Sequence, residues 1–257
     1  VVEHVENGIV YEKRDLCGVD FLYSREYKEL HISMSAYTDK LFKTTFKADA
    51  DKVKIPTSPT FSEKTLVQHQ NEARENPNFE PEEFPIRQLI GGLLWATTQA
   101  RPDLAAPVHF LARVVGKGPL TKGIVNAAKK VLGYMWVTRG KGISYTPQKE
   151  AAFAKTYGDL LRKAGAEQVL SDWNLFNDAS FATCAVTLRS ISGSVLYYRG
   201  TPIDWRSSRQ TVRAYSTAES EYIAASDGLV FSRTQSFLDF FKPLDKKEPL
   251  IWCDNVS

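Results

Sequence analysis

Three acidic residues in the last third of the chain, Asp178, Glu221 and Asp254, have the type and order needed to hold metal ions. Hydrolysis of a phosphodiester by two metal ions needs several carboxylates at one point, because the ions take oxygen ligands and together stabilise the attacking and leaving oxygens. Taken singly, an Asp at a strand end is typical of turns, and a Glu in a first helical turn is typical of caps. The ordered set is what indicates a metal site.

The predicted helix start offers two glutamates for that site, Glu219 and Glu221. Ser216 and Glu219 have the spacing of a capping box, in which the Glu carboxylate binds the backbone. Glu221 lies two residues further on and is turned by about 200° at 3.6 residues per turn, so the two glutamates cannot share one helix face. The capping role of Glu219 leaves Glu221 for the metal site.

The segment that carries these carboxylates is basic. Between Asp178 and Glu219 the single acidic residue is Asp204, which favours a polyanionic partner beside the metal ions. The sequence has no Gly-rich phosphate loop, no metal-spaced His pair and no nucleophile elbow, so other chemistries find little support. The candidate nucleic-acid contacts in this segment are Arg189, Arg206, Arg209 and Arg213.

Local patterns predict the elements that must position the carboxylates. Ser216 opens a long helix that Pro243 ends. Three strands, a helix and a strand indicate an α+β or mixed α/β fold with a parallel strand after the crossover. If the first and fourth strands are neighbours, Asp178 and Asp254 lie side by side and the helix start brings Glu221 over them. The predicted strands are residues 175–184, 193–198, 203–207 and 250–253, with a hairpin turn at Arg199-Gly200.

The rest of the chain divides into three regions. Residues 1–51 hold a β-like stretch at 16–23, alternating apolar residues at 30–34 and a helix-like run at 37–46. Residues 52–85 are rich in Pro, Ser, Thr, Asn and Glu, which predicts a linker. Residues 86–150 predict a helical region, with helices at 87–98, at 103–115 and after a cap at Thr121.

The helical region is also basic, since residues 104–149 contain eight Lys or Arg and no Asp or Glu. A stretch of that length in a nearly neutral protein predicts a surface that meets phosphates. Lys122, Lys129 and Lys130 are its candidate nucleic-acid contacts. The alternative is a solvated helix face that is turned toward an acidic neighbouring domain.

Composition sets the limits of these predictions. With 257 residues, 43% of them hydrophobic and 12% aromatic, the chain can form two compact modules with a linker or one large domain. Cys17, Cys184 and Cys253 match no zinc or CxxC pattern, which favours reduced, mostly buried thiols in an intracellular protein. The longest apolar run, residues 89–96, is too short to cross a bilayer.

Over nearly its whole length the chain resembles the reverse transcriptase–ribonuclease H region of copia-type retrotransposon polyproteins. Residues 177–182 (NDASFA) stand where the family has SDADWA, 189–193 (RSISG) are similar to RSTSG, and 216–222 (STAESEY) resemble SSTEAEY. Residues 253–255 (CDN) match CDN. Upstream, residues 87–95 and 101–104 are similar to the family's YRQLIGSLLY and TRPDI, and residues 127–134 to AAKRVLRYL. So many pieces in one order make the resemblance specific.

The resemblance implies a ribonuclease H-like mixed sheet at 172–257. It also implies the end of the reverse transcriptase palm and start of the thumb at 1–51, the linker at 52–85, and a largely helical thumb/connection region at 86–150. Asp178, Glu221 and Asp254 match the first three carboxylates that bind two Mg²⁺ (or Mn²⁺) ions. The family's fourth carboxylate is expected beyond Ser257, so 172–257 is expected to be C-terminally truncated. Ser180 and Phe181 depart from the family's acidic residue and Trp, which points to divergence or decay.

The activity that the resemblance implies is hydrolysis of the RNA strand of RNA–DNA hybrids during reverse transcription, by a fragment of a retrotransposon Pol polyprotein. The implied partners are the hybrid and the remainder of the polyprotein, in a cytoplasmic virus-like particle or the nucleus. The chain contains no Asp-Asp pair, so it lacks the family's polymerase motif and is not expected to polymerise DNA. The alternatives are a non-catalytic module that grips hybrid through residues 104–149, and a decayed retroelement relic.

Overall fold

The structure is a computed structural model that describes residues 2–47, 56, 58–166, 170–184, 187–232 and 249–253. The chain divides into two compact units. Unit 1 comprises residues 1–26 and 30–143, and unit 2 comprises residues 27–29 and 144–257. Among the described residues, no helix is both long and apolar enough to cross a membrane.

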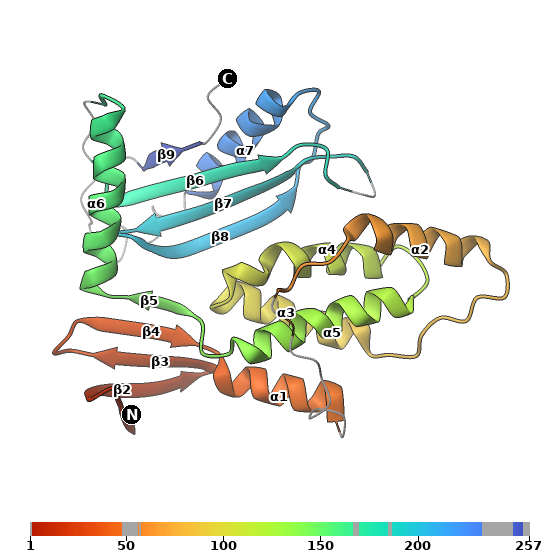
Figure 1. Cartoon of the computed structure of the whole chain (residues 1–257), viewed down its shortest axis with the longest axis horizontal. Coiled ribbons are helices and arrows are strands. Elements are labelled where there is room, and N and C mark those ends of the chain that lie inside the picture. The colour runs from red at the N-terminus through yellow and green to blue at the C-terminus, as the bar shows by residue number, and fades with distance from the viewer. Residues whose placement is uncertain are drawn as a thin grey trace. The chain divides into compact units, whose positions relative to one another are not determined.

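The first sheet is five-stranded, in the order β1-β2-β3-β4-β5 (Figure 1). Asn7-Gly8 and Cys17-Gly18 have positive φ at both positions, which is the backbone of the tight type I′ hairpin turn. The single strand predicted over 16–23 is therefore wrong, because the chain turns at Cys17-Gly18. The strands are β1 (Val2–Glu6), β2 (Ile9–Leu16), β3 (Val19–Ser24), β4 (Glu29–Ser33) and β5 (Ile143–Tyr145).

The helices of unit 1 pack around a continuous apolar core. Leu93, Leu104, Leu111 and Val131, which come from successive helical segments, are fully buried in it. Thr121 caps the last of these helices as predicted, since its Oγ1 accepts a hydrogen bond from the Ile124 amide at 3.4 Å. The helical elements are α1 (Ser35–Phe46), α2 (Glu63–Glu75), α3 (Ile86–Gln99), the 3₁₀ turn η2 (Pro102–Leu104), α4 (Ala105–Val115) and α5 (Lys122–Val137).

The segment predicted to be a linker, residues 52–85, contains α2 and so differs from that expectation. Leu66 and Gln70 of α2 are buried, and Gln70 Nε2 donates to the carbonyl oxygens of Val114 and Pro119 at 3.2 Å. Ser62 caps the helix through the Thr65 amide. The composition of the segment obscured a helix that tertiary contacts hold in place.

Unit 2 is built on a mixed four-stranded sheet in the order β8-β7-β6-β9. Adjacent strands β6, β7 and β8 pair antiparallel, whereas β9 pairs in parallel with β6. Figure 1 shows β9 beside β6 and β8 on the far side of β7. The predicted order of three strands, a helix and a parallel strand is present. The elements are α6 (Pro147–Lys163), β6 (Trp173–Ser180), β7 (Ile191–Tyr198), β8 (Thr201–Arg209), α7 (Thr217–Phe231) and β9 (Leu250–Trp252).

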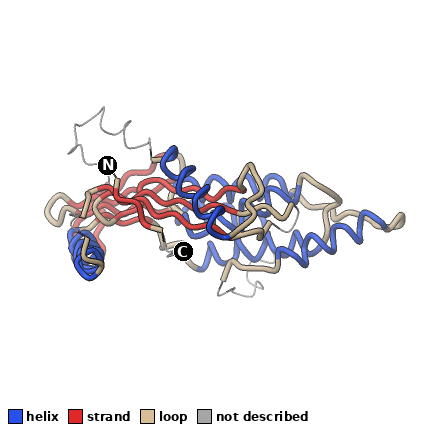
Figure 2. Tube along the Cα trace, turned by 90° about the horizontal axis from the view of Figure 1, so that it is seen from above, coloured by secondary structure: helices blue, strands red, loops and turns tan. Residues whose placement is uncertain are grey.

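Two helices lie on opposite faces of this sheet (Figure 2). On one face, α6 places Phe153 and Tyr157 against an aromatic cluster, with the rings of Phe153 and Tyr197 stacked 5.7 Å apart. On the other face, α7 approaches β6 so closely that a Cβ added at Gly228 would overlap the Asn177 amide. The strand between the helices therefore has one face turned to each, by ordinary alternation of side chains.

The three cysteines, all within the described residues, form no disulfide. Cys184 is buried, but Cys17 and Cys253 are exposed. The prediction of mostly buried thiols is therefore wrong. Cys17 lies in a two-residue hairpin turn, which places its side chain at the surface.

Candidate metal-dependent nuclease site

Asp178 lies near the end of β6, with its side chain exposed. The residue before it, Asn177, is buried against α7, so alternation along the strand turns Asp178 toward the opposite face. Its partner across the sheet is Gly193, which has no side chain to cover it. The carboxylate of Asp178 is accessible to a solute on that face.

Glu221 reaches the strand that carries Asp178. It lies in the first turns of α7, and its Oε1 accepts a hydrogen bond from the Ala179 amide at 3.3 Å. Ala179 and Glu221 are 42 positions apart in the sequence, and Ala179 directly follows Asp178 near the end of β6. The structure thus brings the Glu221 carboxylate to the backbone beside Asp178.

Glu219 has the capping role that the sequence predicted. Its backbone amide donates to Ser216 Oγ at 3.1 Å, and its Oε2 accepts from the Tyr215 amide at 2.7 Å. Both contacts satisfy backbone donors at the start of α7 that would otherwise lack partners in the helix. The carboxylate of Glu219 is therefore occupied at the helix start, while that of Glu221 meets the backbone near the end of β6.

Asp254, the third predicted ligand, lies outside the described residues. The strand that precedes it, β9, is described and pairs with β6 through Phe176 and Trp252. Within the described ranges no group of three or more His, Cys, Asp or Glu side chains could hold a metal ion. Asp178 and Glu221 are the two predicted ligands whose positions the structure gives.

The four candidate arginines of unit 2 do not share one surface. Asp178 pairs with Gly193, which pairs with Ser207, so these three positions face the same side of the sheet. Arg209 is two residues after Ser207 and therefore lies on the same face as Asp178. Arg206 pairs with Ser194 and lies on the α7 face. Arg189 precedes β7 and is half-buried, while Arg213 is exposed and its Nη2 donates to the Thr187 carbonyl at 3.4 Å.

The three candidate lysines lie on α5 of unit 1. Lys122 is exposed at the start of the helix. Lys129 Nζ lies 4.8 Å from the centre of the Phe84 ring, and Lys130 Nζ donates to the Thr60 carbonyl at 2.6 Å. Two of the three charges therefore also serve contacts within unit 1.

Comparison with known proteins gives relatives but no family model and no solved structure that match. The chain is 26% identical over 251 residues to the retrovirus-related Pol polyprotein from transposon TNT 1-94 of Nicotiana tabacum, covering 95% of this chain and 16% of the polyprotein. It is 23% identical to a transposon Ty5-1 protein of Saccharomyces cerevisiae, covering 85% of this chain and 63% of that protein. The chain is a homologue of copia-type retrotransposon Pol polyproteins.

The chain also matches secreted RxLR effector protein 161 of Plasmopara viticola. The two are 29% identical over 143 residues, which cover 56% of this chain and 85% of the effector. The chain spans less than two thirds of the length of the tobacco and yeast relatives.

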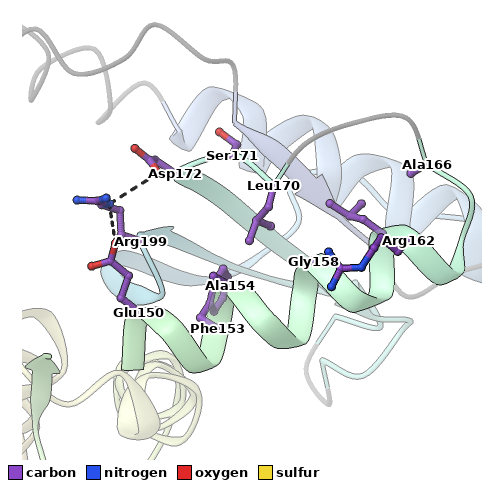
Figure 3. A pocket seen from close by; sticks show the side chains of 11 residues that line it. Glu150, Phe153, Ala154, Gly158, Arg162, Ala166, Leu170, Ser171, Asp172 and Arg199 are labelled. Carbon is purple, nitrogen blue, oxygen red and sulfur yellow. Dashed lines mark ion pairs between the residues drawn. The ribbon is translucent and has the colours of Figure 1, made fainter. Parts of the chain in front are cut away.

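A cavity of about 420 Å³ lies between α6 and the start of β6 (Figure 3). Arg199 Nε lies 2.9 Å from Glu150 Oε1 and 3.7 Å from Asp172 Oδ1 at its edge. Asp172 directly precedes β6, whereas Asp178 lies near the end of that strand. The cavity is therefore separate from the carboxylates.

Several features that shape the site were not predicted. Helix α6 has Thr146 as its cap and Pro147 in its first turn, which is a recognisable helix start. Gly228 of α7 lies against Asn177, next to Asp178, and Gln210 after β8 contacts Ser220, next to Glu221. Only the glycine carries a sequence signal, since Gly is unfavourable inside a helix. Nothing local marks Gln210, because its contacts come from distant segments.

Proposed function

We propose that unit 2 is a ribonuclease H-type domain that hydrolyses the RNA strand of RNA–DNA hybrids. One observation carries the proposal: the Glu221 carboxylate binds the Ala179 amide, directly beside Asp178, at the end of the strand that pairs with β9. Phe176 and Trp252 are register partners, and Asp178 and Asp254 each follow their partner by two residues in the sequence. This is the reason to include Asp254 in the site.

The chemistry of these residues fits divalent ions. Asp178 and Glu221 offer carboxylate oxygens, which are the ligands that Mg²⁺ prefers and Mn²⁺ accepts. Asp178, Glu221 and Asp254 would hold the ions, which when bound would polarise the phosphate and activate the attacking water. The protein residues orient that site: the Ala179 amide holds the Glu221 carboxylate, and the Ser216–Glu219 cap fixes the helix start that carries it.

Substrate binding is proposed for the face of the sheet that carries Asp178. Arg209 lies on that face, and Gly193 leaves the surface beside Asp178 without a side chain. A guanidinium there attracts the phosphates of a polyanion, and the A-like shape and 2′-hydroxyls of a hybrid provide selectivity without reading of bases. The remainder of the Pol polyprotein is the proposed further partner.

The proposal is tested by cleavage of a labelled RNA–DNA hybrid with Mg²⁺, by this chain and by a longer chain that continues past Ser257. Asp178→Asn is expected to abolish cleavage, because an amide is a much weaker ligand for Mg²⁺ than a carboxylate. Lys64→Gln, at an exposed position on α2 of unit 1, is the control and is expected to retain cleavage within about twofold, since an exposed charge contributes little. Metal-independent cleavage, or none in the longer chain, contradicts the proposal.

A second function is a module that binds hybrid without cutting it. The exposed Lys122 and the absence of acidic residues at 104–149 favour it. Hybrid binding that weakens with salt and with Lys122→Gln, together with no cleavage by the longer chain, would support this function in place of the first.

A further inference from the structure

Several buried polar side chains lie between α7 and the sheet in unit 2, in addition to the apolar contact of Phe231. The members of this polar layer are less than a tenth exposed, and most lie on β6, the strand that carries Asp178, or on the neighbouring strand β7. Buried polar groups are costly unless they are hydrogen-bonded, so a layer of them fixes geometry more strictly than an apolar contact does. The members are Asn177, Ser192, Ser194, Gln210 and Ser220.

Gln210 joins three segments within this layer. Its side chain is 1% exposed. Its Nε2 donates to Ser192 Oγ on β7 at 2.9 Å and to the Ser220 carbonyl on α7 at 2.8 Å. The backbone amide of Gln210 donates to the Ser190 carbonyl at 2.9 Å. Because a carbonyl can only accept, the Ser220 contact also identifies which end of the amide group points to the helix.

The two groups that accept hydrogen bonds from Gln210 Nε2 are both close neighbours of the Glu221–Ala179 contact. Ser220 directly precedes Glu221, and Ser192 is the register partner of Ala179, whose amide Glu221 accepts. Gln210 therefore connects the helix turn that carries the carboxylate to the pair of strands on which the carboxylate rests.

We propose that Gln210 is a positioning residue for Glu221: it holds the first turns of α7 at the height above β6 and β7 where the carboxylate meets the Ala179 amide. The inference rests on the proposed function only for its consequence, which is that Gln210 sets the affinity of the site for divalent ions. A residue that orients a metal ligand commonly changes metal affinity by roughly tenfold to a hundredfold when it is replaced.

The same layer provides a matched control. Ser194 Oγ donates to Asn177 Oδ1 at 2.9 Å, and this pair lies under Gly228, further along α7. Ser194→Ala removes one buried hydrogen bond beneath this helix, and Gln210→Leu removes the two that Gln210 Nε2 donates. Only Gln210→Leu removes one from the turn that carries Glu221.

The experiment compares the whole chain with Gln210→Leu and Ser194→Ala in three measurements: thermal unfolding, hydrogen exchange of the Ala179 amide, and Mn²⁺ binding. Both variants are expected to unfold at lower temperatures than the unsubstituted chain, Gln210→Leu at the lower of the two. Gln210→Leu is expected to speed exchange at Ala179 by about tenfold or more and to weaken Mn²⁺ binding by roughly tenfold. Ser194→Ala is expected to change both by less than about twofold. Gln210→Met serves as the second variant if Gln210→Leu does not fold.

Unchanged exchange at Ala179 in the folded Gln210 variant overturns the proposal, as does an equal loss of Mn²⁺ binding in both variants. If neither the unsubstituted chain nor the longer chain that continues past Ser257 binds Mn²⁺, the proposed nuclease function fails. Hydrogen exchange of the Ala179 amide alone then decides whether Gln210 positions Glu221.

Discussion

The two units bury their helices against different kinds of surface. In unit 1, helices α3, α4 and α5 meet through Leu, Ile and Val side chains such as Leu93 and Leu111. In unit 2, Phe231 at the end of the described part of α7 packs on an apolar cluster of the sheet, but the turn that carries Glu221 is held by the hydrogen bonds of Gln210. Apolar contact is non-directional, whereas a buried hydrogen bond requires its partners at set distances and angles. Unit 1 is thus built for stability, and the α7 contact of unit 2 for the placement of a carboxylate.

The largest expected effect is in the apolar core of unit 1. Leu111→Ala removes a fully buried side chain from α4, and we expect a loss of about 2–5 kcal/mol in the free energy of unfolding. Urea unfolding followed by circular dichroism measures it. Hydrogen exchange of the Ala179 amide in unit 2 should not change below the unfolding transition. A changed exchange rate at Ala179 would show that the apolar core of unit 1 also affects the position of Glu221 in unit 2.

A smaller loss is expected where α7 meets the sheet. Gly228→Ala places a methyl group on the Asn177 amide, which Ser194 holds in place. The helix must shift, at a net cost of about 1–3 kcal/mol. Thermal unfolding gives the cost, and the Ala179 amide reports whether Glu221 has moved with the helix. A variant that is more stable than the parent chain contradicts the close approach of α7 to β6.

The smallest effect has the opposite sign. Gly91 lies inside α3 of unit 1, with no described atom within 4 Å of an added Cβ. Gly91→Ala should therefore stabilise the protein by about 0.5–1 kcal/mol, since Ala favours the helix and meets no clash. The same Gly→Ala substitution is thus expected to stabilise at the open position in α3 and to destabilise where α7 contacts β6. Thermal unfolding of both glycine variants under one set of conditions provides the comparison, and two shifts of equal sign would refute it.

Prediction from the sequence was most successful where local chemistry decides. The hairpin around Arg199-Gly200 formed as predicted, because that turn needs positive φ at both positions. The errors came where turn and cap residues were not used in the prediction, or where tertiary contacts outweighed the local composition. Cys17-Gly18 divides a predicted strand by the same turn chemistry, and Thr146-Pro147 opens the unpredicted α6. Helix α2 lay hidden in a polar segment, because burial of only a few side chains holds it.

The amino-acid sequence by itself determined the start of α7 and the role of Glu219, because Ser216 and Glu219 are three residues apart and cap the helix within a single turn. It also determined, by exclusion, that Glu221 was the glutamate left to face the sheet. Only the tertiary structure decided where that carboxylate rests. The Ala179 amide that it accepts is 42 residues away, and Gln210 holds the helix over strands that meet only in the folded sheet. Local spacing fixes backbone caps, but a ligand position depends on contacts between distant segments.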